Sequence, residues 1–278
     1  MTGADGQASR GDVRVRWLAC GEQDLPDGTA WLAERERARA AGLRFAKRRS
    51  EYLLRRWAGK RAVAAATGLD DAPGDLARVE VAHEPGGAPY VLVDGRAAAL
   101  NISLTDRAGW AVCLLTRAGA RVGCDLELVE PRSDGFVRDF LTPAERALVE
   151  AMTRRGQDAA GADAARVGRD TAANLLWSAK ESALKVLGTG LRRDTRSVEV
   201  TVPDPAPAGG TWARLLVRTA EGRAFPGWWT RCGAFLLTVA AEERVLAPAA
   251  LGGSADLGRA VPVHSWVAHP LSVDRPAP

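Results

Sequence analysis

A chain of 278 residues is long enough for one large domain or two domains of ordinary size. Its composition, 46% hydrophobic and 26% charged, is that of a globular protein, and no run approaches the roughly 20 apolar residues of a membrane span. The opening stretch, MTGADGQASRGD, lacks the apolar core of an export signal, so we expect a cytoplasmic protein that does not bind membranes.

Cysteine and histidine usage argues against metal sites built from these residues. The four cysteines contain no C-x-x-C pair, and the three histidines show no ligand spacing. Scattered cysteines fit a reducing cytoplasm. Structural zinc and a His-based catalytic triad are therefore not expected.

The net charge of +4 is mild, but basic residues concentrate between positions 35 and 61, where the only acids are Glu36 and Glu51. Such clustering suits an anionic partner, which could be nucleic acid, a phosphate ester or an acidic protein. A solvated helix surface explains the same arginines equally well.

The predicted elements begin with a strand over 12–18 and two helices over 29–41 and 43–67, the second ending at Gly68. Gly and Pro turns then separate four short β-rich segments, which are 78–82, 89–93, 100–104 and 109–116.

The rest of the regular part starts with the strand RVGCDLELV and a helix over 143–153. Because segment 154–170 is rich in Gly, Ala, Asp and Arg, we expect a mobile loop there, before a helix over 171–187. Strands follow in SVEVTV, WARLLVRT, WWTRC and AFLLTVA. After about residue 245 the chain is rich in Pro, Gly and Ala, which predicts a poorly ordered or loosely packed tail.

An internal correspondence relates the two long helices. WAGKRAVAAATG (57–68) and WSAKESALKVLG (177–188) share Trp, Lys and Gly at identical spacing, and each pair lies 120 residues apart. A VEV strand follows each helix. The shared order predicts two similar α+β halves joined near residue 120, with a cleft between them where a small ligand would bind.

Two carboxylates lie two positions apart on the predicted strand VGCDLEL. Side chains at i and i+2 of a strand point to the same face, so Asp125 and Glu127 lie side by side. Like charges on one face repel unless a cation lies between them. Alternatively, each acid could cap a turn or face solvent.

The second long helix carries a further acid, Glu181, on the same face as Lys185. In isolation these two residues would form a helix-stabilising ion pair. Together with Asp125 and Glu127, however, Glu181 completes a set of hard oxygen ligands of the kind that Mg²⁺ prefers. A metal there would also bind a pyrophosphate, and Arg and Lys of the first half would hold further phosphates, as in phosphoryl transfer.

VGCDLE followed by WSAKESALKVLGTGL resembles the signature pair of the Sfp-type 4′-phosphopantetheinyl transferases, a G-x-D-x-E strand and a W-x-x-K-E-x-x-x-K helix. LNISLTDRAGW (100–110) resembles the family's N-x-S segment. FLTPAERALV (140–149) resembles the segment that introduces its mobile region. The resemblance covers about residues 12–245, in order.

The resemblance implies an enzyme of the holo-[acyl-carrier-protein] synthase type. Such an enzyme moves the 4′-phosphopantetheine arm of coenzyme A onto a serine of an acyl or peptidyl carrier protein and releases adenosine 3′,5′-bisphosphate. The implied fold is an α+β pseudo-dimer with coenzyme A in the cleft between its halves and Mg²⁺, or Mn²⁺, as the metal. We expect a disordered N-terminus, two halves and a Pro/Gly/Ala-rich tail, at 1–11, 12–118, 119–245 and 246–278.

The resemblance also implies the roles of the site residues. Carried over by motif, Asp125, Glu127 and Glu181 are the metal ligands. Glu181 would also help to deprotonate the carrier serine, and Lys185 would donate charge or a proton to the departing bisphosphate. Glu145, in the TPAE segment, is a further candidate for a base.

Two positions depart from the family pattern. The family's His after the N-x-S serine is Leu104 here, and its Lys before the Pro of the preceding loop is Ala88. Neither side chain can contact a phosphate through charge or a hydrogen bond, so we expect other groups to recognise the 3′-phosphate of coenzyme A. The candidates are Ser103, Thr105, Arg107, Arg48, Arg49, Arg56 and Lys60.

Two alternatives stay open. A catalytically weak relative would bind coenzyme A or carrier proteins without turnover, as the missing His and Lys suggest. A nucleic-acid-binding protein would use the Arg-rich helix, but the modest net charge and the lack of an aromatic platform argue against it. Chain length favours a monomer, and the expected carriers belong to fatty-acid or secondary metabolism.

Overall fold

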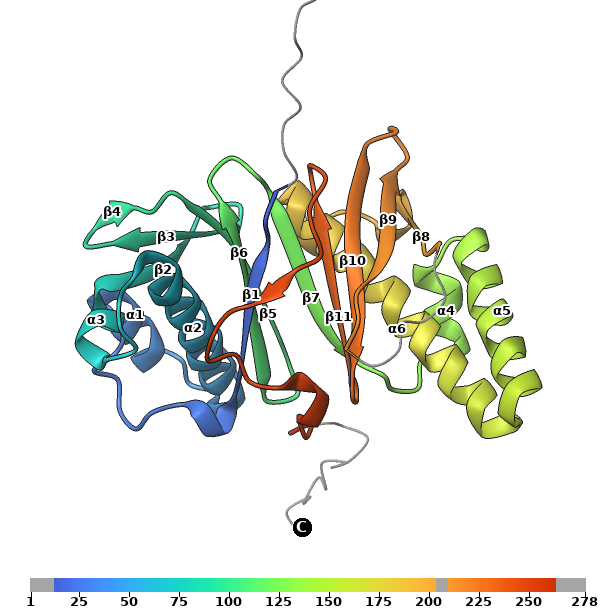
Figure 1. Cartoon of the computed structure of the whole chain (residues 1–278), viewed down its shortest axis with the longest axis horizontal. Coiled ribbons are helices and arrows are strands. Elements are labelled where there is room, and N and C mark those ends of the chain that lie inside the picture. Colours follow the sequence, from blue (N-terminus) through green and yellow to red (C-terminus); the bar gives the residue numbers. More distant parts are fainter. Residues whose placement is uncertain (1–12, 204–209, 264–278) are drawn as a thin grey trace, which may run out of the picture.

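The computed structural model describes residues 13–203 and 210–263 and shows an α+β protein (Figure 1). Two sheets stack against each other in the middle of the molecule. The long helices α2 (Ala46–Thr67) and α6 (Ala162–Leu187) pack on the outer faces of these sheets. The α+β class predicted from the sequence is confirmed.

The first half contains a sheet in the order β12-β1-β6-β5, antiparallel except for the parallel pair of β12 and β1. A second antiparallel sheet, β2-β3-β4, packs against α2. The strands are β1 Arg16–Gly21, β2 Val79–His83, β3 Pro89–Val93, β4 Arg96–Ala97, β5 Leu100–Arg107, β6 Trp110–Arg117 and β12 Ala249–Ala250. The shorter helices are α1 Glu34–Ala41 and α3 Pro73–Arg78, with 3-10 turns at Glu22–Asp24 and, near the end of the chain, Leu257–Arg259.

The second half contains an antiparallel sheet in the order β7-β11-β10-β9-β8. Its strands are β7 Val122–Leu128, β8 Val198–Thr201, β9 Ala213–Thr219, β10 Ala224–Cys232 and β11 Phe235–Ala241. The other helices are α4 Asp134–Phe140 and α5 Pro143–Ala160, with 3-10 turns at Gly190–Arg192 and Thr195–Ser197.

Three apolar clusters hold the layers together, one under each long helix and one between the two stacked sheets. The alternation along β7 contributes to the cluster between the sheets, because Cys124, Leu126 and Leu128 point into it. This leaves the opposite face of β7 for the polar residues of the motif.

The matching lysines of the two long helices make matching buried contacts. Lys60 pairs with Glu36 at 2.6 Å, and Lys180 pairs with Glu145 at 2.7 Å. Each lysine also donates to two backbone carbonyls in the segment that leads into the next strand. Each glutamate accepts the amide of its own helix N-cap and an amide of that strand. The repeat seen in the sequence therefore corresponds to a repeated set of structural contacts.

The expectation of a mobile loop over 154–170 is wrong, because the end of α5 and the beginning of α6 occupy this segment. The two helices approach closely at their glycines. A Cβ atom on Gly156 would lie 2.3 Å from the carbonyl oxygen of Ala164, and one on Gly168 would lie 2.6 Å from that of Met152. The small residues thus allow close helix packing.

The expectation of a loose tail is also wrong for residues 246–263. β12 pairs with β1 just after a bridge between Val245 and Val13, and Leu257, which is 1% exposed, joins the cluster between the sheets. The expectations for 1–11 and for the rest of the tail lie outside the described residues. No helix within 13–203 or 210–263 has the length and apolar character to cross a membrane.

Candidate active site

One face of β7 and the facing side of α6 bring the predicted acids together. Lys185 of α6 contacts Asp125 of β7, and Trp177 of α6 contacts Glu127 of β7. Glu181 lies one turn from each of these two helix residues, so it faces the same strand. Four charged residues from two motifs thus meet at one place.

Asp125 is 8% exposed, and its two oxygens have different surroundings. Oδ1 accepts hydrogen bonds from Lys185 Nζ at 2.9 Å and from Thr105 Oγ1 at 3.2 Å. Oδ2 is buried and has no hydrogen-bond partner. A buried carboxylate oxygen without a partner costs free energy until a ligand satisfies it.

Glu181 has the same feature, because its Oε1 atom is buried without a hydrogen-bond partner. Burial and then the charge of Asp125 raise the pKa of Glu181 to about 7, although Lys185 acts in the opposite direction. The ionised carboxylate therefore lacks enough positive charge around it.

Glu127 differs from the other two acids in that both of its oxygens have partners. Oε1 accepts from Trp177 Nε1 at 3.1 Å. Oε2 accepts from Arg132 Nη2 at 3.2 Å and lies 3.2 Å from Arg107 Nε. Burial and the neighbouring Asp125 raise the pKa of Glu127 to about 7, against the lowering effect of the two arginines.

Lys185 provides the fixed positive charge of the site. Its ammonium donates to the carbonyl oxygen of Cys124 at 2.7 Å and to Asp125. Burial is the largest single effect and lowers the pKa of Lys185, but Asp125, Cys124 and Glu181 together outweigh it and raise this pKa above its usual value. Lys185 is therefore a cation at neutral pH, suited to stabilising negative charge on a phosphate.

A divalent cation fits part of this acid set. Within the described residues, no group of three or more His, Cys, Asp or Glu side chains is already arranged around one point as a metal site. The unpaired oxygens of Asp125 and Glu181, however, are hard donors of the type that Mg²⁺ takes. The prediction of a metal site with three carboxylate ligands stays a prediction.

A cleft of about 1000 Å³ runs past this point. Asp125 and Lys185 lie in its wall, together with the loop between β2 and β3, one side of β5 and the segment after α6. Arg55, Arg121 and Arg192 also lie in the wall, as does His83, whose pKa burial and Arg56 lower to about 4. The cleft is large enough for a nucleotide-sized ligand, and its lysine and arginines face the acids Glu84, Asp106 and Asp125 of the same lining.

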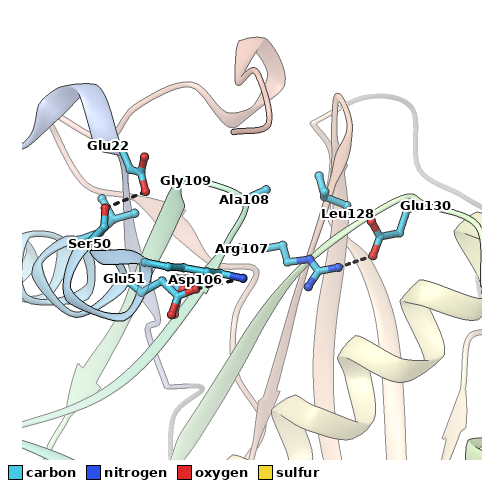
Figure 2. A pocket seen from close by; sticks show the side chains of 11 residues that line it. Glu22, Ser50, Glu51, Asp106, Arg107, Ala108, Gly109, Leu128 and Glu130 are labelled. Atoms are coloured by element: carbon cyan, nitrogen blue, oxygen red, sulfur yellow. Dashed lines mark hydrogen bonds and ion pairs between the residues drawn. The ribbon is translucent and has the colours of Figure 1, made fainter. Parts of the chain in front are cut away.

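A smaller cavity of about 100 Å³ lies between α2, the β5–β6 turn and the end of β7 (Figure 2). Figure 2 shows Arg107 reaching from the end of β5 to Glu130, with which its guanidinium pairs. Because Arg107 also contacts Glu127, this cavity adjoins the acid-bearing face of β7.

Ser103 and Thr105, predicted as ligand contacts, join the two halves instead of offering free hydroxyls. Ser103 Oγ accepts the amide of Cys124, and Thr105 Oγ1 accepts the amide of Leu126. Both residues line the cleft, but they are at most 5% exposed. Their hydroxyls connect β5 to β7 and so position Asp125.

The predicted basic residues divide into buried and exposed groups. Lys60 is fully buried, and Arg56 is 5% exposed beneath Tyr52 and His83. Arg48 and Arg49 are exposed on α2, and neither lines the large cleft. The structure thus brings neither Lys60 nor this exposed pair to the acid face of β7.

Glu145 also lies outside the candidate site. It is 1% exposed, and backbone amides and Lys180 satisfy its carboxylate. Its place as the N3 residue of a capping box at the start of α5 explains its presence in the TPAE segment. No carrier serine could reach it without opening the core.

Sequence reasoning missed several residues of the site. Arg132 and Glu130 follow β7 directly in VEPR, and a search for charges next to the acid pair could have found them. His83 and Arg192 come to the cleft from segments that carry no recognisable motif. Their place in the same cleft as Lys185 is seen from the fold alone.

Comparison with known proteins finds a family resemblance in the second half of the chain. Residues 121–230 match the family model of the 4′-phosphopantetheinyl transferase superfamily, ACPS. The match covers β7, the acid pair and the whole of α6. This part of the chain therefore resembles the superfamily, which supports a transferase. No curated protein matches the chain.

Two solved structures resemble part of the fold. One is a holo-(acyl-carrier-protein) synthase from Bacillus anthracis str. Ames in complex with CoA (3′,5′-ADP), with 18% identity and a TM-score of 0.32, covering 39% of this chain and 99% of that one. The other is a Thermotoga maritima holo-[acyl-carrier-protein] synthase, with 20% identity and a TM-score of 0.30, covering 47% of this chain and 76% of that one. Scores this low support no argument about the site.

Proposed function

We propose that this protein transfers 4′-phosphopantetheine from coenzyme A to a serine of an acyl or peptidyl carrier protein, with Mg²⁺ or Mn²⁺ as cofactor. The observation that carries the proposal is the juxtaposition of Asp125 and Lys185, which lie in the wall of the large cleft, with Glu181 one helical turn from Lys185. Two buried oxygens without partners and a lysine cation suit a metal-bound pyrophosphate.

The proposed reaction is a displacement at the β-phosphorus of coenzyme A. The carrier serine oxygen forms the new P–O bond, and the bond from that phosphorus to the bridging oxygen breaks. The bridging oxygen keeps the electron pair and leaves as part of adenosine 3′,5′-bisphosphate. A metal ion, when bound, would neutralise phosphate charge.

The protein side chains supply proton transfer and charge. Glu181, with a pKa raised to about 7 by burial and Asp125, would accept the serine proton directly or through water. Lys185 would stabilise the charge on the leaving bisphosphate. Asp125 would hold the metal together with Glu181, and Thr105 keeps Asp125 in position.

Recognition of the 3′-phosphate is proposed to rest on basic residues near the two departures from the family pattern. Leu104 and Ala88 both line the large cleft. His83 ends β2 just before the loop that carries Ala88, and Arg192 donates to the carbonyl oxygen of Gly86 in that loop. Arg192 is therefore better placed than Arg48 and Arg49 for a charged contact. Burial and Arg56 lower the pKa of His83 to about 4, so His83 would contribute a hydrogen bond from a neutral ring.

The wider setting remains part of the proposal. We propose a monomeric pseudo-dimer with halves near 12–118 and 119–245, whose matching Glu–Lys contacts support the division. We further propose cytoplasmic action on carriers of fatty-acid or secondary metabolism. Such carriers are usually acidic around their serine, and the basic rim from α2 would attract them.

The second candidate is a relative that binds coenzyme A without turnover, favoured by Leu104 and Ala88. Incubation with coenzyme A, Mg²⁺ and an apo carrier, followed by chromatography for adenosine 3′,5′-bisphosphate, separates the two. Bisphosphate that forms only with the carrier supports transfer. Calorimetric binding of coenzyme A without bisphosphate supports the second candidate.

A further inference from the structure

We infer that Glu127 is a positioning residue held by two arginines and is not a ligand of the metal, which Asp125 and Glu181 bind directly. The inference rests on the proposed function only in assuming a divalent cation at this site. It assigns different roles to two acids that share one face of one strand.

The first step is the saturation of the Glu127 carboxylate. Trp177 donates a hydrogen bond to Oε1, and Arg107 and Arg132 both pair with Oε2. The Glu127 side chain is 12% exposed. Both oxygens of this carboxylate already have partners, so a divalent cation could bind it only by displacing one of them.

The second step is that neighbouring contacts anchor both arginines. Arg132 Nε donates to Asn174 Oδ1 at 2.6 Å, and Asn174 is fully buried on α6. The Arg132 guanidinium also lies over the ring of Phe136 at 4.8 Å. Arg107 pairs with Glu130 as well as with Glu127, and Figure 2 shows it extended across the cavity wall toward Glu130.

The third step is the contrast with the other two acids. Asp125 Oδ2 and Glu181 Oε1 are buried polar atoms without a partner, as metal ligands are expected to be before the metal binds. Lys185 compensates Asp125, whereas two arginines compensate Glu127. The oxygens that are free to bind a metal therefore belong to Asp125 and Glu181.

The positioning role follows from these contacts. Glu127 bridges the end of β5, the segment after β7 and α6, through Arg107, Arg132 and Trp177 respectively. It fixes the two guanidinium groups next to the metal site. Without the charge of Glu127, Glu130 alone would compensate both guanidinium groups, and their excess positive charge would repel a cation at the metal site.

The test measures Mn²⁺ binding to the whole protein, without coenzyme A, from the electron paramagnetic resonance signal of free Mn²⁺. Asp125→Asn and Glu181→Gln are each expected to weaken binding about tenfold or more, since each removes a ligand oxygen. Glu127→Gln is expected to weaken it less. Its amide keeps an acceptor for Trp177, and circular dichroism melts check that each variant is folded.

A charge-restoring double variant separates a ligand from a positioning residue. Glu127→Gln combined with Arg107→Gln removes one negative and one positive charge, so Mn²⁺ affinity should return to within about threefold of the wild type. The matched control, Asp125→Asn with Arg107→Gln, should still bind Mn²⁺ weakly, because the ligand carboxylate of Asp125 is missing.

Two results would overturn the inference. One is a Glu127→Gln/Arg107→Gln protein that stays as weak as the Asp125→Asn control, because Glu127 would then supply a ligand oxygen. The other is a wild type that binds no Mn²⁺. Failure of the transferase proposal would look different: the expected Mn²⁺ pattern together with no bisphosphate from coenzyme A and carrier.

Discussion

Gly123 of β7 lies directly against Ser182 of α6, so closely that a Cβ atom on Gly123 would be 2.1 Å from the Ser182 carbonyl oxygen. This contact sets the distance between strand and helix. Because the strand carries Asp125 and the helix carries Glu181 and Lys185, it also sets the geometry of the candidate site. The glycine of the motif is therefore explained by close packing of two backbones.

Gly123→Ala should push α6 away from β7, lower stability by about 1–3 kcal/mol and reduce transfer more than stability alone would explain. Urea unfolding and the transfer rate check this. Gly74→Ala is the matched control, since a Cβ at this helical position meets nothing within 4 Å and should be neutral or slightly stabilising. Equal changes in unfolding free energy and transfer rate for the two variants would contradict the close packing of Gly123 on Ser182.

Glu181→Gln should stabilise the metal-free protein at high pH. The folded-state pKa of Glu181, about 7, lies above its ordinary value of 4.5 because of burial and Asp125, so the ionised form is unfavourable in the fold. The penalty is absent below about pH 4.5, grows as the pH rises and is complete above about pH 7, at roughly 2–3 kcal/mol.

The measurement for this prediction is urea unfolding in EDTA at about pH 5 and about pH 8. The free energy of unfolding of the variant should exceed that of the wild type by much more at the higher pH than at the lower pH. Saturating Mg²⁺ should reverse the order, since it stabilises only the protein that has the ligand. A difference that does not change with pH would contradict the assignment.

Lys180→Met should destabilise the fold by about 3–5 kcal/mol, because it leaves Glu145 charged and unpaired in the core. Lys60→Met should have a similar effect through Glu36. Thermal unfolding checks both, and Lys47→Met, which removes a 3.9 Å surface pair with Glu51, should change stability by less than about 0.5 kcal/mol. A Lys180→Met protein as stable as the Lys47→Met protein would show that the buried pairs are not structural.

Arg192→Ala should raise the KM for coenzyme A by about 10–100-fold with a smaller effect on kcat, because a charge-assisted contact to the 3′-phosphate is lost. Steady-state kinetics with 3′-dephospho-coenzyme A provides the control, since that substrate should not distinguish the variant from the wild type. Arg218→Ala, an exposed change on β9, should leave both constants unchanged. Unchanged KM in Arg192→Ala would remove this residue from the proposal.

The sequence predicted the α+β class, the two long helices and the acid face of β7, because each of these features follows from a short local pattern of residues. Gly68 and Gly188 end their helices in the left-handed conformation, as their positions after the apolar periodic segments indicate. The Asp125/Glu127 spacing follows from strand geometry alone. Local rules were enough for these features.

The remaining features depend on contacts between distant segments. Segment 154–170 was mistaken for a loop because the close packing of α5 on α6 at Gly156 and Gly168 requires small residues, which also suit loops. Lys60 and Glu145 looked like candidates for chemistry, yet each is one half of a buried ion pair. The arginines that hold Glu127 come from two separate segments, so the pattern of acids alone could not show these contacts.

The central claim is phosphopantetheine transfer that depends on a divalent cation. Its most direct test is the intact mass of an apo carrier protein after incubation with this protein, coenzyme A and Mg²⁺, with EDTA and the Asp125→Asn variant as controls. The account predicts a gain of one phosphopantetheine that both controls prevent. No gain across several unrelated apo carriers, or a gain that EDTA leaves intact, would contradict it.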